Sequence, residues 1–108
     1  MKEKILFVNS CVRGENESRT LALAKTALSR LDGDIEEIRL ADANLKPLDA
    51  AGLAKRAESA EKNDFSDPVY DCAKQFAACD TVVIAAPFWD YSFPAFLKIY
   101  IESLCVGG

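Results

Sequence analysis

A cluster of hydroxyls with one arginine, between an apolar run and an amphipathic segment, is the first group of residues that could do chemistry. Ser10 follows the apolar run at 5–8, and Ser18, Arg19 and Thr20 open the amphipathic segment. Hydroxyls and free N–H groups at a helix N-terminus suit phosphate or another anion. The segment matches neither GxGxxG nor GxxxxGK[ST], so it predicts neither a dinucleotide fingerprint nor a P-loop. Two interpretations stay open: an anion site, or only a helix cap at Ser18 and a strand end at Ser10.

The second candidate is an aromatic loop between Pro87 and Pro94, after the most apolar run of the chain. Its aromatic residues are Phe88, Trp89, Tyr91 and Phe93. Flat side chains at a ligand-binding edge can border a planar ring. The alternative is that they cover the end of a sheet or a subunit interface.

The composition removes several kinds of site from consideration. The 108 residues include no histidine, which excludes a Ser-His-Asp triad, a Cys-His pair and a His-ligated metal. A formal charge of -4 argues against nucleic acid or an anionic membrane as the main partner. A chain of this length buries roughly two thirds of its unfolded surface, so we expect one domain over residues 1–108.

The cysteines and the first residues bear on the compartment. Cys11, Cys72, Cys79 and Cys105 form no CxxC pair, so their spacing predicts neither a zinc ribbon nor a redox dithiol. Buried free thiols are expected instead. The apolar run at 5–8 is too short for the core of a signal peptide. We therefore expect a cytoplasmic protein.

Three strands are expected to position the two loops. Residues 5–8 and 81–86 are apolar runs typical of strands buried in a parallel sheet, whereas residues 34–40 have one partly polar face and suit a place nearer the edge. Strands that alternate with helices predict a parallel sheet with right-handed crossovers. Ligands of such sheets bind beyond the carboxyl ends of the strands, which here means the loops after Val8 and Ala86.

Helices are expected to begin near Ser18, residue 50, the Asp67-Pro68 pair and Ser92. Gly33 is expected to stop the first helix. The second, over residues 50–62, has almost no apolar stripe and is expected to be solvated or mobile. The expected apolar face of the third helix is Val69, Cys72, Ala73, Phe76 and Ala77. That of the last helix is Leu97, Tyr100, Ile101 and Leu104.

Two motifs in this order resemble a known family. The motif ILFVNSCVRGENESRT and the later APFWDYSFPAFLKIYIE are similar to those of flavodoxin-like NAD(P)H-dependent FMN reductases and quinone oxidoreductases, which include the FMN-dependent NADH-azoreductases. The second motif is the more diagnostic, with its P-x-W/Y-x-x-S-x-P-A-x-L-K arrangement. The resemblance implies an α/β fold, a flavodoxin-like parallel sheet in three α-β-α layers, truncated after the third strand and the helix that follows it.

The resemblance also implies a cofactor and the residues that hold it. FMN would be the cofactor, with NAD(P)H as co-substrate and a quinone, azo or nitro compound as the electron acceptor. The phosphate would be held by Ser10, Ser18, Arg19 and Thr20. The ring would be bordered by Pro87, Phe88, Trp89 and Asp90. An ionised Asp90 accepts hydrogen bonds and cannot donate them. No residue is assigned a catalytic role, because the flavin supplies the chemistry.

The length implies an incomplete sheet. Five βα units need about 150 residues, so the chain has room for three, and the third flavin loop of the relatives is expected to be missing. In the order 2-1-3-4-5 the strand at 81–86 becomes an apolar edge, which favours pairing with another chain. We expect a homodimer or a complementing chain, joined through that strand or through the aromatic loop and the last helix, where Phe96 and Ile99 are expected to lie off the packed face.

Two other functions remain open on the sequence. The chain could be a truncated or split subunit that keeps the fold and acts through interaction without activity of its own. It could also be an electron-transfer flavodoxin, which the reductase-like second motif makes the weaker alternative.

Overall fold

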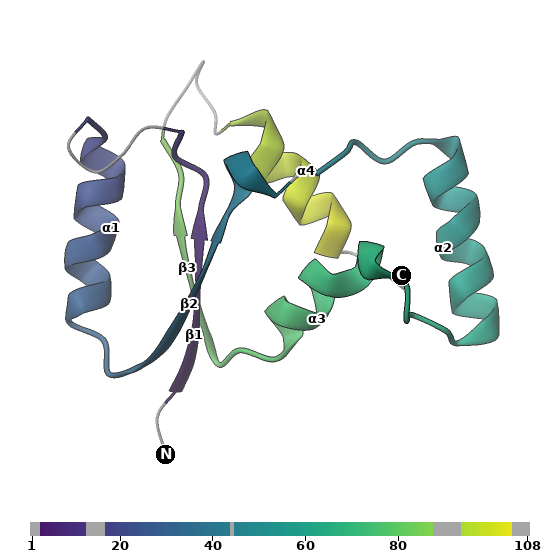
Figure 1. Ribbon diagram of the computed structural model, residues 1–108, viewed down its shortest axis with the longest axis horizontal. Coiled ribbons are helices and arrows are strands. Elements are labelled where there is room, and N and C mark those ends of the chain that lie inside the picture. The colour runs from purple at the N-terminus through teal and green to yellow at the C-terminus, as the bar shows by residue number, and fades with distance from the viewer. Residues whose placement is uncertain (1–2, 13–16, 44, 88–93, 105–108) are drawn as a thin grey trace.

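The computed structural model describes residues 3–12, 17–43, 45–87 and 94–104. Within them the elements follow in the order β1 (Glu3–Asn9), α1 (Arg19–Ser29), β2 (Gly33–Arg39), η1 (Leu40–Asp42), α2 (Ala50–Lys62), η2 (Pro68–Tyr70), α3 (Asp71–Ala77), β3 (Thr81–Ala85) and α4 (Ala95–Leu104), where η marks a 3-10 turn. The strands are parallel in the order β2-β1-β3. Figure 1 shows α1 on one face of the sheet and α3 and α4 on the other, so the predicted three layers are confirmed.

Strand β1 is central because its run is apolar on both faces. Ile5, Leu6, Phe7 and Val8 are each at most 1% exposed. Successive side chains point to opposite faces. Ile5 and Phe7 thus pack with α1, whereas Leu6 and Val8 pack with α4. The expectation of a strand buried on both faces is confirmed.

Helix α1 begins where the sequence predicts and ends slightly earlier. Ser18 is its N-cap and accepts the N–H of Leu21 through Oγ at 3.1 Å. The C-cap is Arg30, and Gly33 is already the first residue of β2, so the prediction that this glycine stops the helix was wrong. The close approach of β1 explains the glycine, because a Cβ there would lie 2.6 Å from the Glu3 carbonyl oxygen.

Helix α2 has no buried residue, as expected from its missing apolar stripe. It lies outside the sheet layers, farthest from α1 (Figure 1). Polar contacts connect it to the rest of the chain: Lys55 pairs with Asp67 next to η2, and Arg56 donates to the Glu102 carbonyl oxygen of α4 at 2.6 Å.

The third helical segment keeps its predicted start and changes its packed face. Asp67 accepts the Val69 N–H at 2.9 Å, which confirms the start, but the segment opens as the 3-10 turn η2 before α3. The changed phase turns Val69 outward at 57% exposure, leaves Phe76 at 36%, and buries Tyr70. The predicted face was therefore wrong at Val69, Phe76 and Ala77, which are exposed, whereas Cys72 and Ala73 are half-buried.

Helix α4 covers the apolar cluster on the face of the sheet opposite α1, as predicted. Leu97 and Tyr100 are buried, with Ile101 and Leu104 packed against the same cluster. Phe96 packs against this cluster too, so the expectation that it lies off the packed face was wrong.

Strand β3 forms one edge of the sheet within the described residues, and β2 forms the other. Ile84 is 48% exposed and Val82 and Val83 are half-buried, so the expectation of a buried strand at 81–86 was wrong at Ile84 and only partly met at the two valines. In the part of the chain that the structure describes, no helix is long and apolar enough to cross a membrane.

Candidate functional site

The loops after β1 and β3 meet at one edge of the sheet. Ser10 donates to the Ala85 carbonyl oxygen twice, through its backbone N–H at 3.0 Å and through Oγ at 2.6 Å. Both bonds are fully protected, since Ser10 is 0% exposed. The two loops begin side by side because parallel strands end at the same edge of the sheet.

The buried position of Ser10 sets what its side chain can do. A hydroxyl has one proton, and the Ala85 carbonyl takes it. Whether this serine also contacts a phosphate stays a prediction. In the structure its side chain holds the two loops together.

The N-terminus of α1 has the donors that an anion needs. Ser18 Oγ caps the Leu21 N–H, and the Ser18 carbonyl accepts from Ala22. The N–H groups of Arg19 and Thr20 have no acceptor among the described residues, as is usual at the start of a helix. These donors, the positive end of the helix dipole and the exposed Arg19 side chain fit a phosphate group.

The second predicted loop is described only at its two ends. Pro87 is half-buried just after β3, and Pro94 is buried just before α4. Phe88, Trp89 and Asp90 lie outside the described residues. Their assignment to a flavin ring stays a prediction.

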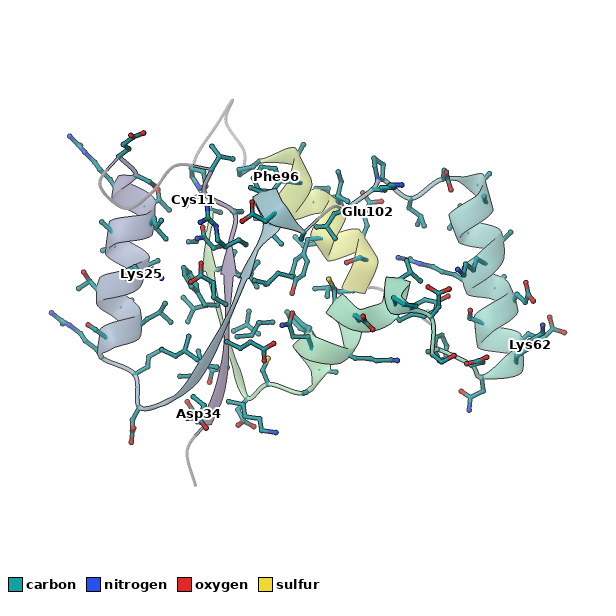
Figure 2. All side chains as sticks on the ribbon, in the orientation of Figure 1. Cys11, Lys25, Asp34, Lys62, Phe96 and Glu102 are labelled. Carbon is teal, nitrogen blue, oxygen red and sulfur yellow. The ribbon has the colours of Figure 1, made fainter. Side chains whose placement is uncertain are left out.

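A polar network beside these loops was not predicted from the sequence. Asn9, the last residue of β1, is 2% exposed and donates from Nδ2 to Glu37 Oε2 at 3.1 Å. Its Oδ1 accepts the Cys11 N–H at 3.0 Å. Lys25 on α1 donates to Glu37 Oε1 at 3.1 Å. In Figure 2 Cys11 lies at the upper end of the sheet and Lys25 lies on α1.

One signal in the sequence pointed to this network. An amide such as Asn9, placed directly after four apolar residues of a buried strand, must find partners inside the protein. The sequence does not say which strand supplies them. The sequence alone predicts that Glu37 is a solvent-facing residue of an edge strand. Only the register of β1 and β2 shows that it can reach Asn9.

The described cysteines differ in burial. All three described cysteines are free thiols, but only Cys11 is buried as expected, whereas Cys72 and Cys79 are half-buried. Burial, with the negative charge of Asp71 adding to it, raises the pKa of Cys72 above its usual value, which disfavours the reactive thiolate. Among the described residues no group of acidic, cysteine or histidine side chains is placed to hold a metal ion.

A cavity of about 220 Å³ lies between α2, η2 and α4, away from the two loops. It is lined by apolar residues such as Leu48, Val69 and Ile99, with Lys55 and Arg56 at its polar side. Both cations already have partners, in Asp67 and in the Glu102 carbonyl oxygen. The loops at the carboxyl end of the sheet remain the better candidate site.

Comparison with known families decides the class of the chain. The family described as having a flavodoxin-like fold matches residues 3–108. The chain belongs to this family. The resemblance drawn from the two motifs is thereby confirmed, and so is the flavodoxin-like fold with its parallel order β2-β1-β3.

The names of the curated relatives that match this chain state one function. The FMN-dependent NADH:quinone oxidoreductase 2 of Clostridium acetobutylicum is 36% identical over 120 residues, covering 97% of this chain and 54% of the relative. The FMN-dependent NADH:quinone oxidoreductase of Clostridium perfringens is 31% identical over 110 residues, covering 97% and 56%. The chain thus spans about half the length of the curated relatives it matches.

Solved structures share the flavodoxin-like fold. An azoreductase from Bacillus anthracis superposes with a TM-score of 0.74 at 23% identity, covering 98% of this chain and 57% of that one. The azoreductase AzrA gives 0.69 at 22% identity, covering 94% and 55%. At these identities the likeness establishes the fold alone.

Proposed function

We propose that this chain supplies the FMN-binding part of an NADH-dependent oxidoreductase that reduces quinones or azo compounds. The observation that carries the proposal is the anion-ready N-terminus of α1, held at the carboxyl end of β1 and connected to the loop after β3 through Ser10. The names of the curated relatives, FMN-dependent NADH:quinone oxidoreductases, support this cofactor and this reaction. Bound FMN would supply the redox chemistry, taking a hydride from NADH and passing the electrons to the acceptor.

The residues of the chain would bind and orient the cofactor. The N–H groups of Arg19 and Thr20, with the Ser18 hydroxyl and the Arg19 guanidinium beside them, would hold the phosphate. Ser10 would hold the phosphate loop against the ring loop. Pro87 and the adjoining residues 88–90 would border the ring. No side chain needs to act as an acid or base, because the flavin carries the reacting atoms.

The decisive experiment is retention of the flavin by the purified chain. FMN is added, the excess is removed by gel filtration, and the visible spectrum is recorded. We expect flavin absorbance in the protein fraction and NADH oxidation when a quinone is supplied. A colourless fraction whose melting temperature FMN does not raise would exclude FMN binding and favour the interaction subunit. A stable semiquinone with slow NADH turnover would favour an electron-transfer flavodoxin.

A matched pair of variants tests the phosphate assignment. Ser18→Ala removes a helix cap beside the proposed phosphate, and Asp49→Ala removes the equivalent cap of α2, where Oδ1 accepts the Gly52 N–H at 2.8 Å. Each loss costs about 1 kcal/mol of stability. We expect Ser18→Ala, above all together with Arg19→Ala, to weaken FMN retention and Asp49→Ala to leave it unchanged. Equal FMN retention in all variants would contradict the assignment of the phosphate to this helix.

A further inference from the structure

Glu37 connects three elements near the proposed phosphate loop. From the edge strand β2, its Oε2 accepts from Asn9 at the end of β1 and its Oε1 accepts from Lys25 of α1, both at 3.1 Å. Asn9 in turn contacts the start of the loop after β1, since its Oδ1 accepts the Cys11 N–H at 3.0 Å. A carboxylate on β2 thus reaches the backbone of the loop after β1 through a single side chain.

The Asn9 amide is the step on which this connection depends. It is 2% exposed, so water cannot replace a lost partner without a rearrangement. A side-chain amide has donors on nitrogen and an acceptor on oxygen, and its partners decide which way it faces. While Glu37 holds Nδ2, Oδ1 is directed at the Cys11 N–H. Without Glu37 a buried donor is unsatisfied, and the amide gains by turning away from the loop.

Lys25 neutralises the negative charge that Glu37 would otherwise place near the anion site. An unpaired Glu37 would repel a phosphate nearby. The Lys25 ammonium pairs with Glu37 and lies 5.2 Å from the centre of the Phe7 ring, a cation–π contact that helps to hold it there. The pair has no net charge, so Glu37 orients Asn9 without making the site less attractive to an anion.

We propose that Glu37, acting through Asn9, is a positioning residue that holds the Cys11 backbone, where the loop after β1 begins, in the shape that suits the phosphate of FMN. It makes no contact with the cofactor in this role. The inference rests on the proposed function, and it assigns the discrimination between FMN and a flavin without phosphate to a residue outside the phosphate loop. Glu37 should therefore affect the two flavins differently.

The test compares FMN with riboflavin, which lacks the phosphate, by fluorescence titration of the full chain. For Glu37→Ala we expect the Kd of FMN to rise about tenfold, because the Cys11 backbone is no longer held by Asn9 in the shape that suits the phosphate, and the Kd of riboflavin to stay nearly constant. Glu37→Gln should restore FMN affinity, because its amide oxygen can still accept from Asn9 although the ion pair with Lys25 is lost.

Glu36→Ala is the matched control. This neighbour is on the same strand, has the same charge and also accepts a hydrogen bond, from Gln75 Nε2 at 2.6 Å, but it points to α3 on the other face. We expect its FMN affinity to equal that of the wild type. The proposal is overturned if both alanine variants behave alike, if Glu37→Gln restores nothing, or if FMN and riboflavin are weakened equally.

A second readout needs no flavin. Amide hydrogen exchange of Cys11 in the unliganded chain should accelerate in Glu37→Ala and not in Glu36→Ala or Glu37→Gln. Unchanged exchange in Glu37→Ala overturns the positioning role whether or not FMN binds. If the wild type binds no FMN while exchange accelerates as expected, Glu37 orders the loop, and its assignment to the phosphate falls together with the proposed function.

Discussion

Asn9 and Ser10 are polar residues at the end of a strand that is otherwise apolar, and each is buried with its partners in place. Asn9 has Glu37 and the Cys11 N–H, and Ser10 has the Ala85 carbonyl oxygen. The resemblance to the reductase family marked Ser10 as a phosphate ligand, whereas the residues alone left a strand end as the alternative. The structure adds a use that the sequence could not specify, since Ala85 is 75 residues away along the chain.

At the residue scale, Glu37 makes stability depend on pH with a definite sign. Burial raises its pKa, but the hydrogen bonds from Asn9 and Lys25 and the charges of Lys25 and Arg39 together outweigh burial and lower the pKa below the ordinary 4.5. A lowered pKa means that the folded chain binds this proton less tightly than the unfolded chain. The stabilisation is then complete above the unfolded value and is lost as the pH falls through the folded one.

We expect the free energy of unfolding of the wild type to exceed that of Glu37→Gln by a constant amount from pH 7 to about 5, and this excess to shrink below that. Urea denaturation at a series of pH values measures it. An excess that grows as the pH falls would contradict the lowered pKa.

At the scale of elements, the strands followed their sequences more closely than the helices did. In an α/β protein an unbroken apolar run such as residues 5–8 predicts a strand that is covered on both faces. The start of the third helical segment was predictable from Asp67-Pro68, but its packed face was not. A 3-10 turn rotates by a different angle per residue than an α-helix, so η2 turned Val69 outward and Tyr70 inward.

Two glycines provide an element-scale prediction with opposite signs. A Cβ on Gly33 would lie 2.6 Å from the Glu3 carbonyl oxygen, so Gly33→Ala must push β1 and β2 apart and should cost about 1–3 kcal/mol. A Cβ on Gly52 in α2 would meet the end of the Leu48 side chain at 3.0 Å, which can move. Gly52→Ala should stabilise by up to about 1 kcal/mol through helix propensity.

Thermal or urea unfolding of both glycine variants measures the two effects. A Gly33→Ala variant as stable as the wild type would mean that the β1–β2 register at Glu3 and Gly33 is not the one described. The Gly52→Ala variant serves as the control for the loss of a glycine as such.

At the scale of the whole molecule, the described sheet leaves β3 without a neighbour on one side, as the order 2-1-3-4-5 predicts for a chain of this span. The exposed Ile84 is the local consequence. Unpaired N–H and C=O groups on an apolar strand favour pairing with another strand. The expectation of a homodimer or a complementing chain stays a prediction on this basis.

We expect the chain to dimerise at micromolar concentration and Ile84→Lys to convert it to a monomer, because a charge on an exposed edge strand opposes pairing. Size exclusion with light scattering measures the mass. Ile35→Lys is the control, since Ile35 is 46% exposed on β2 at the opposite edge. A monomeric wild type would refute the prediction. Dissociation of the dimer by Ile35→Lys alone would show that the interface is at β2 and not at β3.

Local patterns in the sequence determined the α/β class, the parallel sheet and the two loops at its carboxyl edge: apolar runs, the Ser18 and Asp67 caps, and the rule that parallel strands end at a common edge. The order of the strands came from the resemblance to the reductase family. Only the tertiary structure decided which side chains meet there. The network of Asn9, Glu37 and Lys25 joins residues from three elements, and its hydrogen bonds depend on the register and spacing of those elements, which no local pattern contains.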